Sequence, residues 1–209
     1  MSIKENLEKI KAKASSARIV AVTKGVALDG VLEAIQAGIT DIGENRIQEA
    51  QQKIPSLKKQ FPNLKSHMIG HLQTNKVKAA LELFDVIQSV DSLHLAEEIS
   101  KRAAKPVEIM IEVNTSGEAS KHGVKPENTM ELLSQISRLP NLLISGLMTV
   151  GPMTYDIGLI RKAFRELRGL RDKAGLEHLS MGMSDDYPLA IEEGSDIIRI
   201  GRVLFQKEE

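Results

Sequence analysis

The sequence predicts an α/β fold: a single (β/α)8 barrel of the TIM type with one extra helix at the N-terminus. Short runs rich in β-branched residues alternate with longer segments in which apolar residues recur every three or four positions. This alternation is typical of a parallel sheet with right-handed helical crossovers. There are eight such runs in a chain of 209 residues, and about 200 residues is the lower size limit of such barrels.

The eight runs have the composition of buried strands. Several, such as Leu142–Met148, are apolar on both faces, as expected when helices cover the sheet. An open doubly wound sheet is the alternative, but eight units without an obvious change in connection length favour a closed barrel. The expected strands are Ile19–Thr23, Asp41–Gly43, Ser66–Ile69, Val86–Val90, Val107–Val113, Leu142–Thr149, His178–Met181 and Ile197–Ile200.

The segments between these runs have helical periodicity. The longest, Ile157–Ala174, places Ile160, Phe164 and Leu167 on one helical face. Before the first strand, Ser2–Lys13 has the same spacing of apolar residues and predicts the extra helix. Further helices are expected at Leu28–Ala37, Leu93–Ala104 and Met130–Leu139. No linker, repeat or low-complexity tract interrupts the pattern, so one domain is expected over residues 1–209.

The composition argues against several function classes. Lys and Arg total 28, as do Asp and Glu, so the formal net charge is zero. Nucleic acids and membrane surfaces favour basic proteins, and neither is an expected partner. The absence of cysteine excludes disulfides, thiolate nucleophiles and thiolate metal sites. No stretch approaches the roughly 20 apolar residues that cross a bilayer, and residues 1–14 do not resemble a signal peptide, so a cytoplasmic location is expected.

Lys24 is the leading candidate functional residue. Active sites of TIM-type barrels lie at the carboxyl ends of the strands, and Lys24 ends the apolar first strand. A dry barrel mouth would keep such an amine neutral and nucleophilic toward an aldehyde. The alternative is a lysine whose ammonium simply reaches solvent.

The last two strands end in residues that could bind an anion. Gly182 and Gly201 would let free backbone N–H groups approach a phosphate. The alternative is that Ser184 caps a helix that begins with two acids. Arg199 lies within an apolar strand, where a guanidinium needs a partner, and a structural ion pair is one interpretation.

The histidines show no spacing typical of a metal site, and no metal is expected. His71 follows the third strand and is a candidate site residue. We interpret His94, His122 and His178 as ordinary residues.

Motifs along nearly the whole chain resemble those of one known family. They are Ala21–Lys24, Gly43–Glu49, His67–Lys76, Val113–Glu118, Ser120–Gly123, Gly146–Met148, Leu179–Asp186 and Arg199–Gly201. In this order and spacing they resemble the pyridoxal phosphate homeostasis proteins, also called the YggS-like or proline synthetase co-transcribed family. The fold of that family is similar to the barrel domain of alanine racemase.

The resemblance implies a pyridoxal 5′-phosphate (PLP) site. Lys24 would form the Schiff base, Arg199 would approach the pyridine nitrogen, and residues after the last two strands would surround the phosphate. The implied cofactor-binding residues are Lys24, Asn45, Met148, Ser184, Arg199, Gly201 and Arg202. The chain departs from the family at Arg202, where a small hydroxyl residue is common, at Gln206, where glycine is common, and at His71, where proline is frequent.

The function implied by the resemblance is intracellular PLP homeostasis, meaning storage, delivery or buffering without robust turnover. No catalytic residue is expected. An arginine at the pyridine nitrogen weakens the electron sink, and alanine racemase takes its second base, a tyrosine, from a domain missing here. The alternatives are a PLP-dependent amino-acid racemase, with weak activity at most, and a Schiff-base aldolase without cofactor. The expected partners are PLP and PLP-dependent apoenzymes that accept it, and a monomer or weak dimer is expected.

Overall fold

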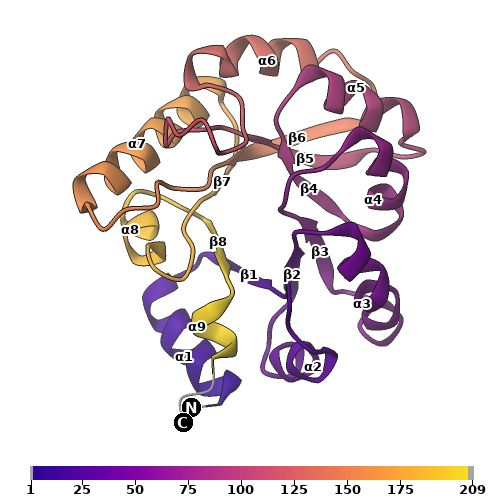
Figure 1. Ribbon diagram of the computed structural model, residues 1–209, viewed down its shortest axis with the longest axis vertical. Coiled ribbons are helices and arrows are strands. Elements are labelled where there is room, and N and C mark those ends of the chain that lie inside the picture. The colour runs from indigo at the N-terminus through magenta and orange to yellow at the C-terminus, as the bar shows by residue number, and fades with distance from the viewer. Residues whose placement is uncertain (1, 207–209) are drawn as a thin grey trace.

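Eight parallel strands pair in sequence order, and β8 pairs with β1 to close a barrel that the helices surround (Figure 1). The computed structural model describes residues 2–206. The strands are β1 Arg18–Val22, β2 Asp41–Glu44, β3 Lys65–Met68, β4 Val86–Val90, β5 Val107–Glu112, β6 Leu142–Met148, β7 His178–Ser180 and β8 Ile197–Ile200. The closed barrel and its eight strands are therefore confirmed, each end within about one residue of its expected place, and the open sheet is excluded.

The helices follow the expected order. Five correspond to predicted segments: α1 Ile3–Ala14, α2 Leu28–Gln36, α5 Leu93–Arg102, α6 Thr129–Ile136 and α7 Ile157–Ala174. The expected helix at Met130–Leu139 was too long, because the chain leaves α6 at Ser137 in a turn before Pro140. The helices whose bounds were not predicted are α3 Ile47–Gln60, α4 Val77–Leu83, α8 Tyr187–Glu192 and α9 Arg202–Phe205.

The barrel divides the apolar core into an outer and an inner part. The outer part lies between strands and helices and includes the fully buried Phe164 of α7. The inner part is small and consists of Val20, Met110, Met148 and Ile197. Much of the remaining barrel interior is therefore filled by polar side chains, which must find partners among themselves.

The extra helix α1 packs against α9 and α8 (Figure 1). Ser2 and Glu5 form a reciprocal capping box that begins α1. From the inner face of α1, Asn6 Nδ2 donates hydrogen bonds to the carbonyl oxygens of Leu204 and Gln206, at 3.1 and 3.0 Å. This side chain therefore ties α1 to the segment that follows β8. Among residues 2–206, no helix has the length and hydropathy that a bilayer crossing requires.

We expect Asn6→Ala to lower the free energy of unfolding by about 2 kcal/mol, because two hydrogen bonds are lost at about 1 kcal/mol each. Urea unfolding of the two proteins measures the difference. Lys4→Ala, an exposed substitution in the same helix, is the control and should stay within about 0.5 kcal/mol of the unaltered protein. Equal effects of the two substitutions would show that the bridge contributes nothing.

Candidate functional site

Lys24 lies in the turn after β1, at the carboxyl end of the barrel. Val20 faces the barrel interior, and alternation along β1 places Val22 on the same side, two residues before Lys24. The structure differs from the dry environment that we expected, because the Lys24 side chain is exposed. Among the described residues its ammonium has neither a hydrogen-bond nor an ion-pair partner. The amine is therefore positioned at the barrel mouth but not tied to the protein.

Side chains of β2 and α3 hold the turn that carries Lys24. Lys53 Nζ donates a hydrogen bond to the Thr23 carbonyl oxygen at 2.7 Å, and the Gly25 N–H donates to Glu49 Oε2 at 2.9 Å. The Thr23 hydroxyl donates to the buried Glu44 Oε1 at 2.6 Å. The backbone is thus fixed on both sides of Lys24. Lys53 is not among the residues predicted from the sequence, although its spacing of four from Glu49 on one helical face was a visible signal.

Asn45 follows β2 and contributes a buried polar atom without a partner. Its Oδ1 accepts no hydrogen bond within the described part of the chain. The residue lines a cavity of about 690 Å³, together with Met68, Gly70, His71 and His122. A buried amide oxygen without a partner is costly, and a ligand is one way to satisfy it.

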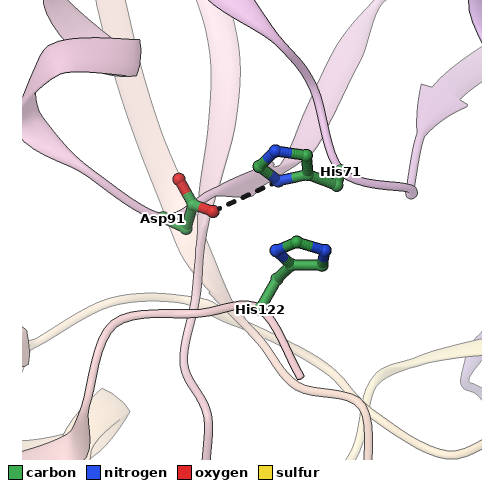
Figure 2. A group of neighbouring side chains, drawn as sticks. All are labelled: His71, Asp91 and His122. Carbon is green, nitrogen blue, oxygen red and sulfur yellow. Dashed lines mark ion pairs between the residues drawn. The ribbon is translucent and has the colours of Figure 1, made fainter. Parts of the chain in front are cut away.

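His71, Asp91 and His122 lie close together (Figure 2), and both histidines line this cavity. His71 Nδ1 lies 3.4 Å from Asp91 Oδ2, and the rings of His71 and His122 stack with centroids 4.0 Å apart and planes inclined by 11°. His122, which we interpreted as an ordinary residue, therefore lies beside the cavity. Because the two rings are stacked, the lone pairs of their nitrogen atoms lie in nearly parallel planes. In this arrangement the lone pairs do not point to one common position, as binding of a single metal ion requires.

Arg199 of β8 is buried inside the barrel. Its Nη1 donates to the carbonyl oxygen and to the hydroxyl of Ser180, both at 2.8 Å, and its Nη2 donates to the Thr149 carbonyl oxygen at 2.7 Å. The structural ion pair considered above is absent among the described residues. Burial lowers the pKa of Arg199 to about 10, while the charges of Glu112 and Asp186 act in the opposite direction. The guanidinium therefore remains charged at neutral pH.

The turns after β7 and β8 bring Ser184, Gly201 and Arg202 together. Ser184 Oγ accepts a hydrogen bond from the Val203 N–H at 3.4 Å, so it does not cap α8. The backbone N–H groups of Ser184, Gly201 and Arg202 find no acceptor within residues 2–206. The Arg202 side chain pairs with Asp185 and is exposed. This part of the site therefore offers backbone donors.

Gly182 has a different role from the one expected. Its φ of +93° lies in the left-handed region, and a Cβ there would lie 2.5 Å from the Ala190 Cβ. Glycine is therefore needed for close packing against α8. Gly201 has no such close neighbour, since a Cβ there would meet the Val22 Cβ at 3.4 Å.

The candidate residues follow or end strands β1, β2, β6, β7 and β8, and in a parallel barrel those ends share one rim. Met148, at the end of β6, is part of the inner apolar cluster below this rim. A primary amine, a buried amide, a buried guanidinium and free N–H groups therefore occupy one end of the barrel. This arrangement suits a ligand with an aldehyde, an aromatic ring and an anionic group.

Comparison with known proteins first defines the class. The family described as "Alanine racemase, N-terminal domain" matches residues 1–208. An alanine racemase of Corynebacterium glutamicum shares the fold, with a TM-score of 0.78 and 18% identity. The match covers 99% of this chain and 61% of the racemase chain. The chain is thus an alanine racemase-like barrel.

Relatives of higher identity narrow the assignment. A pyridoxal phosphate homeostasis protein of Aquifex aeolicus is 43% identical over 90% of this chain and 86% of the relative. A protein of the same name from Homo sapiens is 37% identical over 92% of this chain and 77% of the relative. The structure of PipY from Synechococcus elongatus with PLP bound has a TM-score of 0.90 and 33% identity. The match covers 98% of this chain and 100% of the PipY chain. The chain belongs to the pyridoxal phosphate homeostasis protein family.

Proposed function

We propose that this protein binds PLP through Lys24 and takes part in its homeostasis by storing, delivering or buffering it. The observation that carries the proposal is the meeting, at one barrel rim, of an amine without a partner and of backbone N–H groups without acceptors. The similarity to PipY, whose structure contains PLP, supports the same ligand here.

The residues fit the parts of this cofactor. The Lys24 amine would attach to the aldehyde, with release of water. The free N–H groups of Ser184, Gly201 and Arg202 would hold the phosphate without need of the Arg202 side chain. The buried Oδ1 atom of Asn45, which has no partner among the described residues, would accept a hydrogen bond from a group on the ring. Met148 lies in the apolar layer below and would contact the ring face.

Arg199 and the tyrosines favour a carrier over an enzyme. When bound, PLP supplies a reactive aldehyde and an electron-withdrawing pyridine ring, and a charged arginine at the ring nitrogen disfavours the protonation that strengthens withdrawal. Racemisation by two bases needs an acid–base group on each face of the ring. Tyr155 is fully exposed, and Tyr187, the first residue of α8, is packed into the core. Neither supports the racemase alternative, so we propose that robust turnover is absent.

Lys24→Ala should abolish covalent PLP binding. We expect the absorption band of a PLP Schiff base at ~420 nm in the unaltered protein incubated with PLP, and its loss in the variant. Lys65→Ala, at the opposite end of the barrel, is the matched control and should retain the band. Borohydride reduction followed by peptide mass measurement should place the adduct on the peptide that contains Lys24. An adduct elsewhere, or an unchanged band in Lys24→Ala, would refute the assignment.

The remaining parts of the proposal concern partners and place. We propose PLP-dependent apoenzymes as acceptors, because the exposed Lys24 leaves a bound ligand accessible to other proteins. A cytoplasmic location, a monomer or weak dimer and a single domain over residues 1–209 remain predictions. Transfer of PLP from the loaded protein to a PLP-free aminotransferase, faster than release into buffer alone, would support the delivery role.

A further inference from the structure

Five buried polar side chains form a continuous hydrogen-bonded chain through the barrel interior. Asp41 Oδ1 lies 2.9 Å from His67 Nε2, and His67 Nδ1 lies 3.0 Å from Gln88 Nε2. The Ser180 hydroxyl donates to Gln88 Oε1 at 2.6 Å and accepts from Arg199 Nη1 at 2.8 Å. The chain therefore runs from β2 through β3, β4 and β7 to β8.

We propose that Asp41, His67, Gln88 and Ser180 are positioning residues, which together fix the Arg199 guanidinium for the ring nitrogen of PLP. This inference rests on the proposed function for the ligand, but the hydrogen-bonded chain can be tested without it. We call these four residues with Arg199 the interior relay.

Burial makes the interior relay demanding. The exposed fractions of its five residues lie between 0 and 5%, so bulk water cannot serve as a routine partner. Each donor therefore needs an acceptor within the protein, and each missing bond would cost about 1–3 kcal/mol. Such networks specify a single arrangement when every member is satisfied.

The hydrogen bonds of the interior relay are all satisfied when each donor points in one direction along the chain. Burial raises the pKa of Asp41, but hydrogen bonds from His67 and Thr40 outweigh this and leave the pKa lowered, so the carboxylate accepts. His67 then donates from Nε2, and its Nδ1 accepts from the Gln88 amide. Every donor points from Arg199 toward Asp41. In this arrangement His67 carries a proton on Nε2, and Nδ1 is the acceptor.

The other states of His67 leave a donor unpaired. A proton on Nδ1 would face the Gln88 NH2 group, so the amide would have to turn round. Gln88 would then donate to Ser180 Oγ, which already accepts from Arg199. The Ser180 hydroxyl hydrogen would lose its acceptor in a buried place. This cost fixes the orientation of Gln88 and, through Ser180, of Arg199.

The position of Arg199 depends on this support. Apart from Ser180 Oγ, its hydrogen bonds go to two backbone carbonyl oxygens, of Ser180 and Thr149. The side-chain hydroxyl is therefore the contact through which distant residues can act on the guanidinium. The charges of Glu112 and Asp186 favour the charged guanidinium.

The first test uses the PLP-free protein. We expect the 15N chemical shifts of the His67 ring at neutral pH to show a protonated Nε2 and an unprotonated Nδ1. In Gln88→Met, which removes the donor to Nδ1, this preference should weaken. Ser89→Ala is the matched control: its hydroxyl is buried on the same strand but has no partner in the described part of the chain. A proton on Nδ1 of the unaltered protein would overturn the proposal.

The second test uses PLP. Gln88→Met and Ser180→Ala should each raise the dissociation constant for PLP on the order of tenfold, and shift the absorption maximum of bound PLP. Ser89→Ala should change neither. If Gln88→Met fails to fold, Ser180→Ala serves alone. Unchanged affinity and absorption in the relay variants would overturn the positioning role. Failure of the unaltered protein to bind PLP would refute the proposed function, and the His67 shifts would still decide the arrangement of the relay.

Discussion

Glu112→Gln should make the PLP-free protein more stable above pH 7 by about 3 kcal/mol. Burial and the charge of Asp91 raise the pKa of Glu112 to about 7, although Arg199 acts in the opposite direction. Between pH 4.5 and 7 the folded protein retains a proton that the unfolded chain releases, so stability falls as pH rises through this window. A gap of about 2.5 pKa units corresponds to about 3 kcal/mol. Glutamine resembles the protonated form and avoids this loss.

Urea unfolding at a series of pH values measures the effect. The difference between Glu112→Gln and the unaltered protein should be greatest above pH 7 and nearly vanish below pH 4.5. Glu108→Gln changes the same charge on the same strand and is the control, expected to preserve the pH dependence of the unaltered protein. A constant difference at every pH would show that Glu112 is not the group responsible.

The barrel could be predicted because its signals are local. Most strands show in a short run rich in β-branched or other apolar residues, and the long helix α7 shows in the spacing of residues such as Phe164. Helix α3 was harder to delimit, because Pro55 lies inside it and most of its residues are polar. Helix α9 has four residues and is too short to show a period.

The site could be predicted in part, because the carboxyl ends of barrel strands converge whatever the sequence between them. Exposure of Lys24 and the pairing of Arg202 with Asp185 depend on turn geometry that no motif encodes. The interior relay could not be predicted from the sequence, for a different reason. Gln88 and Ser180 are 92 residues apart, and only closure of the barrel brings them into contact.

Gly70 connects the fold to the site through a close backbone contact. A Cβ at this position would lie 2.4 Å from the carbonyl oxygen and 2.7 Å from the Cα of Asn45. These atoms belong to the backbone and cannot turn away as a flexible side chain would. An alanine at Gly70 must therefore displace Asn45, whose buried amide we assign to the ligand.

Gly70→Ala should lower the free energy of unfolding by roughly 1–3 kcal/mol, as overpacking typically does. It should also weaken PLP binding on the order of tenfold, because a lost contact of about 1.4 kcal/mol has that effect. Gly169→Ala is the matched control, because a Cβ there has no neighbour within 4 Å and alanine favours the helix. Urea unfolding and PLP titration of the folded variants separate the two effects. A destabilised Gly70→Ala with unaltered affinity would show that Asn45 does not contact the ligand, since the displacement would have occurred without consequence for binding.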